Sequence, residues 1–140
     1  MLRVVLDTNV YVSAFVFGGP PLEILTLGIR DHIAVFVSAP ILKEIQAVLQ
    51  SKFEWPTRDV REALDAIDAF GSLVVPREAV AVIKDDEPDN RILECAVEGS
   101  AHVIVSGDKH LRALRAYRRI AIMSPREFLD ALSAGVFSAV

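Results

Sequence analysis

Two acidic side chains follow apolar segments of the sequence, at places where a carboxylate could take part in chemistry. Asp7 follows the apolar run 2–6, and Asp108 comes shortly after the apolar run 103–105. In an open parallel sheet, ligands bind beyond the carboxyl ends of the strands, so both aspartates are candidates for a site. The alternative for each is a helix N-cap, in which the carboxylate accepts hydrogen bonds from free backbone N–H groups.

Two further acids lie within segments that have helical periodicity. Glu44 comes three residues after Ile41 and four before Val48, so it borders the buried stripe of its helix. Asp89 stands three, four, seven and eight residues before apolar side chains, so it heads the inward-facing stripe of its helix. An acid in a first turn also complements the helix dipole, but that role does not explain an inward direction.

The sequence permits these four carboxylates to converge, and a converged cluster needs a neutralising partner. Two ionised carboxylates about 4 Å apart repel by roughly 4 kcal/mol at an effective dielectric constant of about 20, so such a cluster holds protons or binds a cation. Oxygen ligands without His or Cys favour Mg²⁺ or Mn²⁺ over Zn²⁺. An ion of this kind suits phosphoryl chemistry, so the pattern indicates a nuclease or a phosphatase.

The elements that would position these acids alternate between short strands and longer helices. Apolar, β-branched runs predict strands at 2–6, 33–37, 73–75, 103–105 and 120–123. Apolar residues that repeat at intervals of three and four predict helices between the strands. Strands that are apolar on both faces indicate a sheet covered on both sides. The predicted fold class is therefore α/β, a three-layer α/β/α arrangement with a mainly parallel central sheet.

Helix starts carry signals of their own. A serine followed closely by a proline marks two predicted helix starts, at Ser38 and at Ser124, and in each the serine can supply a capping oxygen. The second start, 124–127 (Ser-Pro-Arg-Glu), also has the glutamate of a capping box. Pro88 marks an early helical position after the acidic segment 85–87. Because no repeat or linker interrupts the chain, we expect one domain over residues 1–140.

Composition excludes several classes of protein. With 52% hydrophobic and 24% charged residues, the 140-residue chain is far from the disordered class. Its apolar runs are shorter than the roughly twenty residues of a membrane span. Cys95 is the one cysteine, and the start of the chain lacks a basic and then apolar leader. These features predict a soluble, cytoplasmic protein without a membrane partner.

Five segments together resemble a known family. They are 4–9 (VVLDTN), 38–45 (SAPILKEI), 86–96 (DEPDNRILECA), 103–111 (VIVSGDKHL) and 124–129 (SPREFL). Their order and spacing, over nearly the whole chain, resemble the PIN domain. The likeness is strongest to the bacterial and archaeal PIN proteins regarded as toxins of toxin–antitoxin pairs, the VapC-like proteins.

The resemblance implies a ribonuclease that is specific for single-stranded RNA and depends on Mg²⁺ or Mn²⁺. The acidic quartet that it implies, for metal binding and for catalysis, is Asp7, Glu44, Asp89 and Asp108. Asn9 and Ser106 match the positions that orient those carboxylates or a bound water. His110 is a departure, because relatives often carry an Asp two residues after the fourth acid. Loss of that charge weakens a second metal site, so the number of ions stays open.

Basic residues gather directly after Asp108. Within eleven positions the chain carries Lys109, Arg112, Arg115, Arg118 and Arg119. The nearest three, Lys109, Arg112 and Arg115, are predicted to grip RNA phosphates without reading the base sequence. The alternative is a solvated helix exterior. The formal net charge of −4 argues weakly against coating of nucleic acid by the whole surface.

The resemblance also implies partners. PIN toxins commonly pair as homodimers and bind an antitoxin protein along a groove near their first helices. In this chain that region holds Phe15 and Phe17 before a Gly-Gly-Pro-Pro turn. An ordinary core followed by a loop explains the same residues.

Three alternatives compete with the nuclease assignment. A haloacid dehalogenase phosphatase needs a second Asp two residues after its nucleophile, where this chain has Asn9. A receiver domain needs a phosphorylatable Asp after its middle strand, where this chain has Ser38. The third is a catalytically silent PIN-like protein that binds RNA or acts as a scaffold, and retention of all four acids argues against it.

Overall fold

A computed structural model describes residues 1–83 and 87–140 of the chain. Asp85 and Asp86, which precede the predicted helix start at Pro88, lie outside the described residues, as does the first position of the motif 86–96. Within the described residues the strands form one sheet in the order β3-β2-β1-β4-β6-β5. The strands are β1 (Arg3–Leu6), β2 (Ala34–Val37), β3 (Ser72–Leu73), β4 (Val103–Val105), β5 (Ala116–Tyr117) and β6 (Ile120–Met123).

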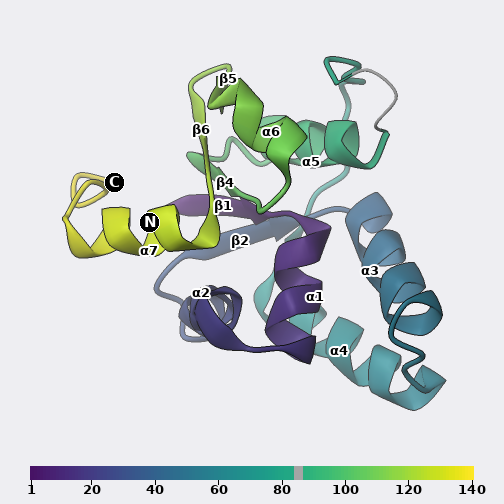
Figure 1. The fold of residues 1–140 in the computed structure, drawn as a ribbon. Helices are drawn as coiled ribbons and strands as arrows, with labels where there is room; N and C mark the ends of the chain where they lie inside the picture. The colour runs from purple at the N-terminus through teal and green to yellow at the C-terminus, as the bar shows by residue number, and fades with distance from the viewer. Residues whose placement is uncertain (84–86) are drawn as a thin grey trace.

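Helices cover both faces of this sheet. They are α1 (Thr8–Val16), α2 (Gly19–Ile29), α3 (Ala39–Ser51), α4 (Thr57–Phe70), α5 (Glu87–Glu98), α6 (Lys109–Leu114) and α7 (Pro125–Ser133). Figure 1 shows α5 and α6 on one face of the sheet and α1, α2 and α4 on the other. Every strand pairing is parallel except that of β5 with β6. The predicted three-layer α/β/α fold with a mainly parallel sheet is confirmed.

The edges of the sheet differ from the sequence prediction. The strand predicted at 73–75 is shorter and earlier, since β3 covers Ser72–Leu73 and Val75 is 78% exposed. An edge strand is covered less fully than a central one, so its apolar residues do not all enter the core. β5 was not predicted, because two residues beside a basic turn carry no periodic pattern.

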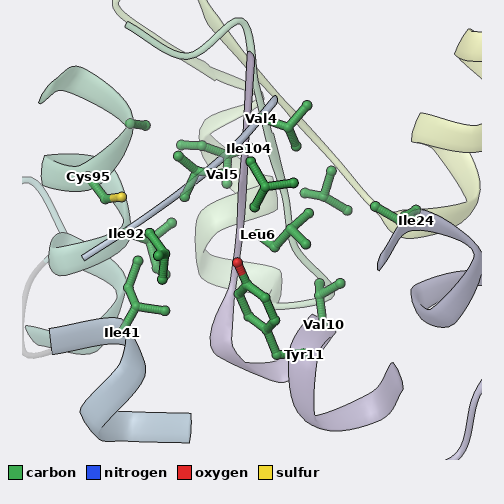
Figure 2. Close-up of a cluster of buried hydrophobic side chains, with 14 of the residues drawn as sticks. Val4, Val5, Leu6, Val10, Tyr11, Ile24, Ile41, Ile92, Cys95 and Ile104 are labelled. Atoms are coloured by element: carbon green, nitrogen blue, oxygen red, sulfur yellow. The ribbon is translucent and has the colours of Figure 1, made fainter. Parts of the chain in front are cut away.

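The core encloses β1 from both sides. Val4, Val5 and Leu6 are fully buried. Figure 2 shows these side chains between Ile92 and Cys95 of α5 on one side and Ile24 of α2 on the other. Burial of an aliphatic side chain contributes about 1.5–3 kcal/mol relative to exposure, so the strand that leads into Asp7 is held firmly.

Two buried polar side chains of α5 hold the preceding loop against the helix. The carboxylate of Glu94 accepts a hydrogen bond from the backbone N–H of Val80 at 2.9 Å. The amide of Asn90 both accepts from the N–H of Ile83, at 3.0 Å, and donates to its carbonyl oxygen, at 2.8 Å. The start of α5 is therefore tied to the chain that precedes it, and this fixes the position of Asp89.

No single helix of the described residues combines the length and hydropathy that crossing a membrane requires. α1 and α2 meet the length and composition requirement only as a pair, and the chain bends by 103° between them.

The predicted capping box at the start of α7 is present. The hydroxyl of Ser124 accepts from the backbone N–H of Glu127 at 3.1 Å, and the Glu127 carboxylate accepts from the N–H of Ser124 at 2.9 Å. Ser38 occupies the N-cap position of α3, as predicted, but its hydroxyl is buried and makes no capping hydrogen bond.

We expect Ser124→Ala to lower the free energy of unfolding by about 1 kcal/mol, because it removes the hydroxyl that accepts from the backbone N–H of Glu127. Urea denaturation monitored by circular dichroism measures this change. Ser133→Ala, at the exposed end of the same helix, serves as the control and should leave stability nearly unchanged. Equal effects of the two substitutions would show that the box does not stabilise α7.

Candidate functional site

Asp7 and Asp108 meet at one edge of the sheet because their strands are neighbours. β1 and β4 are parallel, with Leu6 aligned with Val105. The backbone N–H of Asp7 continues this ladder by donating to the carbonyl oxygen of Val105 at 2.9 Å. Residues that follow the two strands therefore emerge side by side at the carboxyl edge.

The hydroxyl of Ser106 joins these two acidic positions. It donates to Oδ2 of Asp7 at 2.7 Å and accepts from the backbone N–H of Asp108 at 2.9 Å. Ser106 is fully buried, and Asp7 is 5% exposed. One hydroxyl thus orients a buried carboxylate and fixes the chain that carries the second acid.

Burial raises the pKa of Asp7, and the nearby Asp108 carboxylate raises it further, whereas the hydrogen bond from Ser106 opposes the shift. A carboxylate ionised in these surroundings is held against desolvation and against a like charge. Asp7 occupies the N-cap position of α1, but its side chain makes no capping hydrogen bond. The backbone N–H groups of Thr8 and Asn9 nevertheless lie near this carboxylate and oppose the rise in its pKa.

Asp108 does cap its helix. Its Oδ1 accepts from the backbone N–H of His110 at 2.8 Å and from that of Leu111 at 3.1 Å. The N-cap alternative from the sequence is thus correct for Asp108, which holds this role while it lies next to the Asp7 carboxylate. The capping bonds fix the position of the Asp108 side chain at the start of α6.

Asp89 reaches the same place from α5. It lies in the first turn of that helix and is 6% exposed, in keeping with the inward direction that the helical repeat predicts. One ligand atom from each of Asp89, Asp108 and His110 lies within 4.8 Å of the others. Among the described residues this is the group of acidic and histidine side chains that could hold a metal ion.

Glu44 is not part of the group formed by Asp89, Asp108 and His110, and Asn9 lies two residues after Asp7 in the chain. Glu44 is half-buried on α3, which packs against α1 and α5, and its carboxylate is not among the three clustered ligands. Asn9 lies exposed in the first turn of α1, and its backbone N–H is one of the groups that oppose the rise in the pKa of Asp7. The structure therefore places Asp7 near Asp108, with Ser106 hydrogen-bonded to both residues, and it places Asp89 near Asp108 from α5.

Sequence reasoning did not count His110 as part of the site. Its Nδ1 lies 3.9 Å from Oδ1 of Asp108. The available signal was its place two residues after Asp108, where members of the PIN family often carry an acid, and the sequence analysis treated His110 there only as the loss of a charge. Its nearness to Asp89 depends on the packing of two helices and has no signal in the sequence.

These residues fit a divalent cation. Buried and half-buried carboxylates lie close together, and the raised pKa of Asp7 reflects a cost that a positive charge would remove. Carboxylate oxygens are the ligands preferred by Mg²⁺ and Mn²⁺. The arrangement can therefore bind a hard cation and present it at the carboxyl edge of the sheet.

The basic residues after Asp108 divide between two hollows. Lys109, Arg112 and Arg115 are exposed and line one groove of about 760 Å³ with residues of β6. In this groove Arg112 approaches the carboxylate of Glu127 at 3.5 Å. Arg118 and Arg119 line another hollow, and Arg118 forms an ion pair with Glu78.

Cys95 and Tyr11 offer no chemistry at this edge. Burial raises the pKa of the Cys95 thiol to about 12, so the thiol stays protonated and is a poor nucleophile. Tyr11 is fully buried in the core and cannot stack on a nucleic acid base.

Comparison with known families identifies this arrangement. A family model described as the PIN domain matches residues 3–110, a stretch that includes all four predicted acids and His110. The chain belongs to the PIN domain family. Membership supports a nuclease, and hence a hydrolase, activity in general, and it decides against the haloacid dehalogenase and receiver alternatives.

The chain is also similar to one other protein in sequence and to two solved structures in fold. The relative is the uncharacterized protein MJ1680 of Methanocaldococcus jannaschii, 32% identical over 142 residues that cover 92% of this chain and 90% of that protein. A chain of VapBC2 from Rickettsia felis, solved bound to a DNA fragment from their promoter, matches with a TM-score of 0.61 and 16% identity. That match covers 86% of this chain and 97% of the other.

A chain of VapBC-1 from nontypeable Haemophilus influenzae matches with a TM-score of 0.62 and 12% identity, over 89% of this chain and 99% of that one. Identities this low establish a shared fold. The PIN domain described here therefore has the fold found in VapBC structures.

We expect Asp7→Asn to stabilise the metal-free protein. The pKa of Asp7 is higher in the native state than in the unfolded state. As the pH rises between these two values, the unfolded chain loses the Asp7 proton more easily than the native protein does, so the free energy of unfolding falls. In EDTA at neutral pH, urea denaturation should show a higher free energy of unfolding for Asp7→Asn than for the unmodified protein. The gain should vanish below the ordinary carboxyl pKa, where both states are protonated.

Asp68→Asn, an exposed position on α4, is the control for this measurement and should change stability little. A loss of stability in Asp7→Asn at neutral pH would contradict the cost assigned to the buried carboxylate.

Proposed function

We propose that this protein is a metal-dependent endoribonuclease that cleaves single-stranded or loop RNA. The observation that carries the proposal is the meeting of Asp7, Asp89 and Asp108 from three separate elements at one edge of the sheet. Membership in the PIN family supports the same class of chemistry. The cofactor proposed is Mg²⁺ or Mn²⁺.

In this proposal Asp7, Asp89 and Asp108 would hold the ion, with Glu44 acting directly or through water. When bound there, the ion lowers the pKa of an attacking water and neutralises charge on the phosphodiester. Ser106 keeps the Asp7 carboxylate in a single orientation through its 2.7 Å hydrogen bond. Asn9 is proposed to orient a carboxylate or a water from the exposed first turn of α1.

The groove lined by Lys109, Arg112 and Arg115 supports an RNA substrate. Lys109, one of the residues that line it, directly follows Asp108 in the chain, so we place the RNA backbone along this groove. Interactions of this kind add affinity that falls with salt and carry no sequence information. These three residues are therefore proposed to hold the RNA backbone without selecting its base sequence.

The proposal extends to a toxin of a toxin–antitoxin pair, with an antitoxin protein as partner and a homodimer as the active form. Its support is the fold shared with chains of VapBC structures. The two phenylalanines near the end of α1 differ in exposure. Phe15 is half-buried against Trp55, whereas Phe17 is 75% exposed. The exposed part offers an apolar surface to a partner chain.

The competing function is an RNA-binding or scaffold protein that does not cleave. The raised pKa of Asp7 favours the enzyme, because a buried carboxylate beside a second acid costs stability and contributes nothing to RNA binding. RNA bound equally with and without Mg²⁺, and never cut, would favour the competing function.

We expect Asp89→Asn to reduce RNA cleavage by about 100-fold or more, because it removes one negative ligand of the proposed ion. Cleavage of a structured RNA panel with Mn²⁺ measures the effect, and EDTA should abolish activity of the unmodified protein. Asp68→Asn is the matched control and should cleave normally. Full activity in Asp89→Asn, or cleavage that persists in EDTA, would refute the proposed function.

We expect the double variant Arg112→Ala, Arg115→Ala to bind single-stranded RNA more weakly. The slope of log Kobs against log salt concentration should become shallower by about 0.7 for each phosphate that the variant no longer neutralises. Fluorescence anisotropy in Ca²⁺, without turnover, measures both quantities. Arg61→Ala on α4, an exposed arginine away from the groove, is the control. An unchanged salt slope in the double variant would remove these two residues from the RNA interface.

A further inference from the structure

We propose that His110 supplies a nitrogen ligand to the ion held by Asp89 and Asp108, and that this ligand makes the site prefer Mn²⁺ to Mg²⁺. The inference deepens the proposed function, since it rests on the same metal site. It concerns a residue that the acidic quartet does not include.

The distances around His110 suit a shared ion. Its Nδ1 lies 3.9 Å from Oδ1 of Asp108, and a ligand atom of Asp89 completes a group in which all separations are within 4.8 Å. Two atoms bound to one ion at about 2.1 Å are about 3.0 Å apart when adjacent and about 4.2 Å apart when opposite. A small side-chain movement therefore brings the three atoms to bonding distance.

The backbone already places His110 toward the site. Its N–H donates to Oδ1 of Asp108 at 2.8 Å, so one carboxylate holds both the start of α6 and the residue that carries the imidazole. The side chain of His110 is 58% exposed and that of Asp108 is 26% exposed, whereas Asp89 is 6% exposed. The group thus combines a solvent-exposed imidazole with a buried carboxylate, and their ligand atoms lie within 4.8 Å of each other.

The chemistry of imidazole sets the metal preference. A site with two carboxylates and an imidazole carries one negative charge fewer than a site with three carboxylates. The smaller negative charge weakens binding of Mg²⁺. Imidazole binds transition-metal ions well, and Mg²⁺ keeps to oxygen ligands and water. A site that combines two carboxylates with one imidazole thus favours Mn²⁺.

The other histidines of the chain cannot supply this ligand. The chain has three, and His102 accepts a hydrogen bond from the backbone N–H of Arg3 on its Nδ1, at 2.9 Å. His102 and His32 precede β4 and β2, at the amino ends of strands whose carboxyl ends face the site. A histidine nitrogen bound to the ion therefore identifies His110.

The direct test is pulsed electron paramagnetic resonance of the full-length protein loaded with Mn²⁺ alone. Electron spin-echo modulation from a bound ¹⁴N nucleus should appear in the unmodified protein and in the control His32→Gln, which changes an exposed histidine. The signal should be lost in His110→Gln. Bound Mn²⁺ without nitrogen modulation, or modulation that survives in His110→Gln, would overturn the proposal.

Calorimetric titration with Mn²⁺ and with Mg²⁺ tests the preference. We expect His110→Asp to reduce the ratio of Mn²⁺ to Mg²⁺ affinity by about tenfold or more, because it exchanges nitrogen for oxygen and adds a negative charge. An unchanged ratio would overturn the proposed preference. Circular dichroism of each variant verifies that the fold is retained.

Asp89→Asn separates this inference from the proposed function. If that variant loses Mn²⁺ binding while His110→Gln binds and cleaves as the unmodified protein does, the inference fails and the nuclease proposal stands. If Asp89→Asn binds Mn²⁺ normally, both fail together.

Discussion

Carboxylates that are held close together away from water repel one another, and this repulsion is the constraint around which the edge of the sheet is organised. Asp7 is 5% exposed and Asp89 is 6% exposed, so solvent screens neither charge well. The pKa of Asp7 is raised by burial and by the nearby Asp108. A free-energy cost concentrated at one place is typical of functional sites, and a bound cation removes it.

The fold imposes this arrangement through the order of its strands. β1 and β4 are adjacent and parallel although their sequences lie far apart, so the residues that follow them emerge together. Packing of β1 between helices on both faces provides the rigidity that holds Asp7 in place (Figure 2). α5 covers the same face as α6 and brings Asp89 to the start of that shorter helix (Figure 1).

Much of this arrangement could be predicted from the sequence, because its parts are local. Asp7 and Asp108 end β-branched runs that suit buried parallel strands, and the helical repeat shows that Asp89 faces inward. The nearness of His110 to Asp89 could not be predicted, since it depends on how two helices from distant segments pack on one face. β5 was not predicted for a different reason. A strand of two residues has no sequence pattern of its own and is recognised only by its pairing with β6.

Anomalous X-ray diffraction from crystals soaked in Mn²⁺ tests most directly whether these side chains share a cation. The account predicts an anomalous peak about 2.0–2.5 Å from carboxylate oxygens of both Asp89 and Asp108, on the side that faces Asp7. The account would be contradicted if the protein were active with Mn²⁺ but its crystals showed no anomalous peak at this edge of the sheet. A peak only at another place on the chain would contradict it as well.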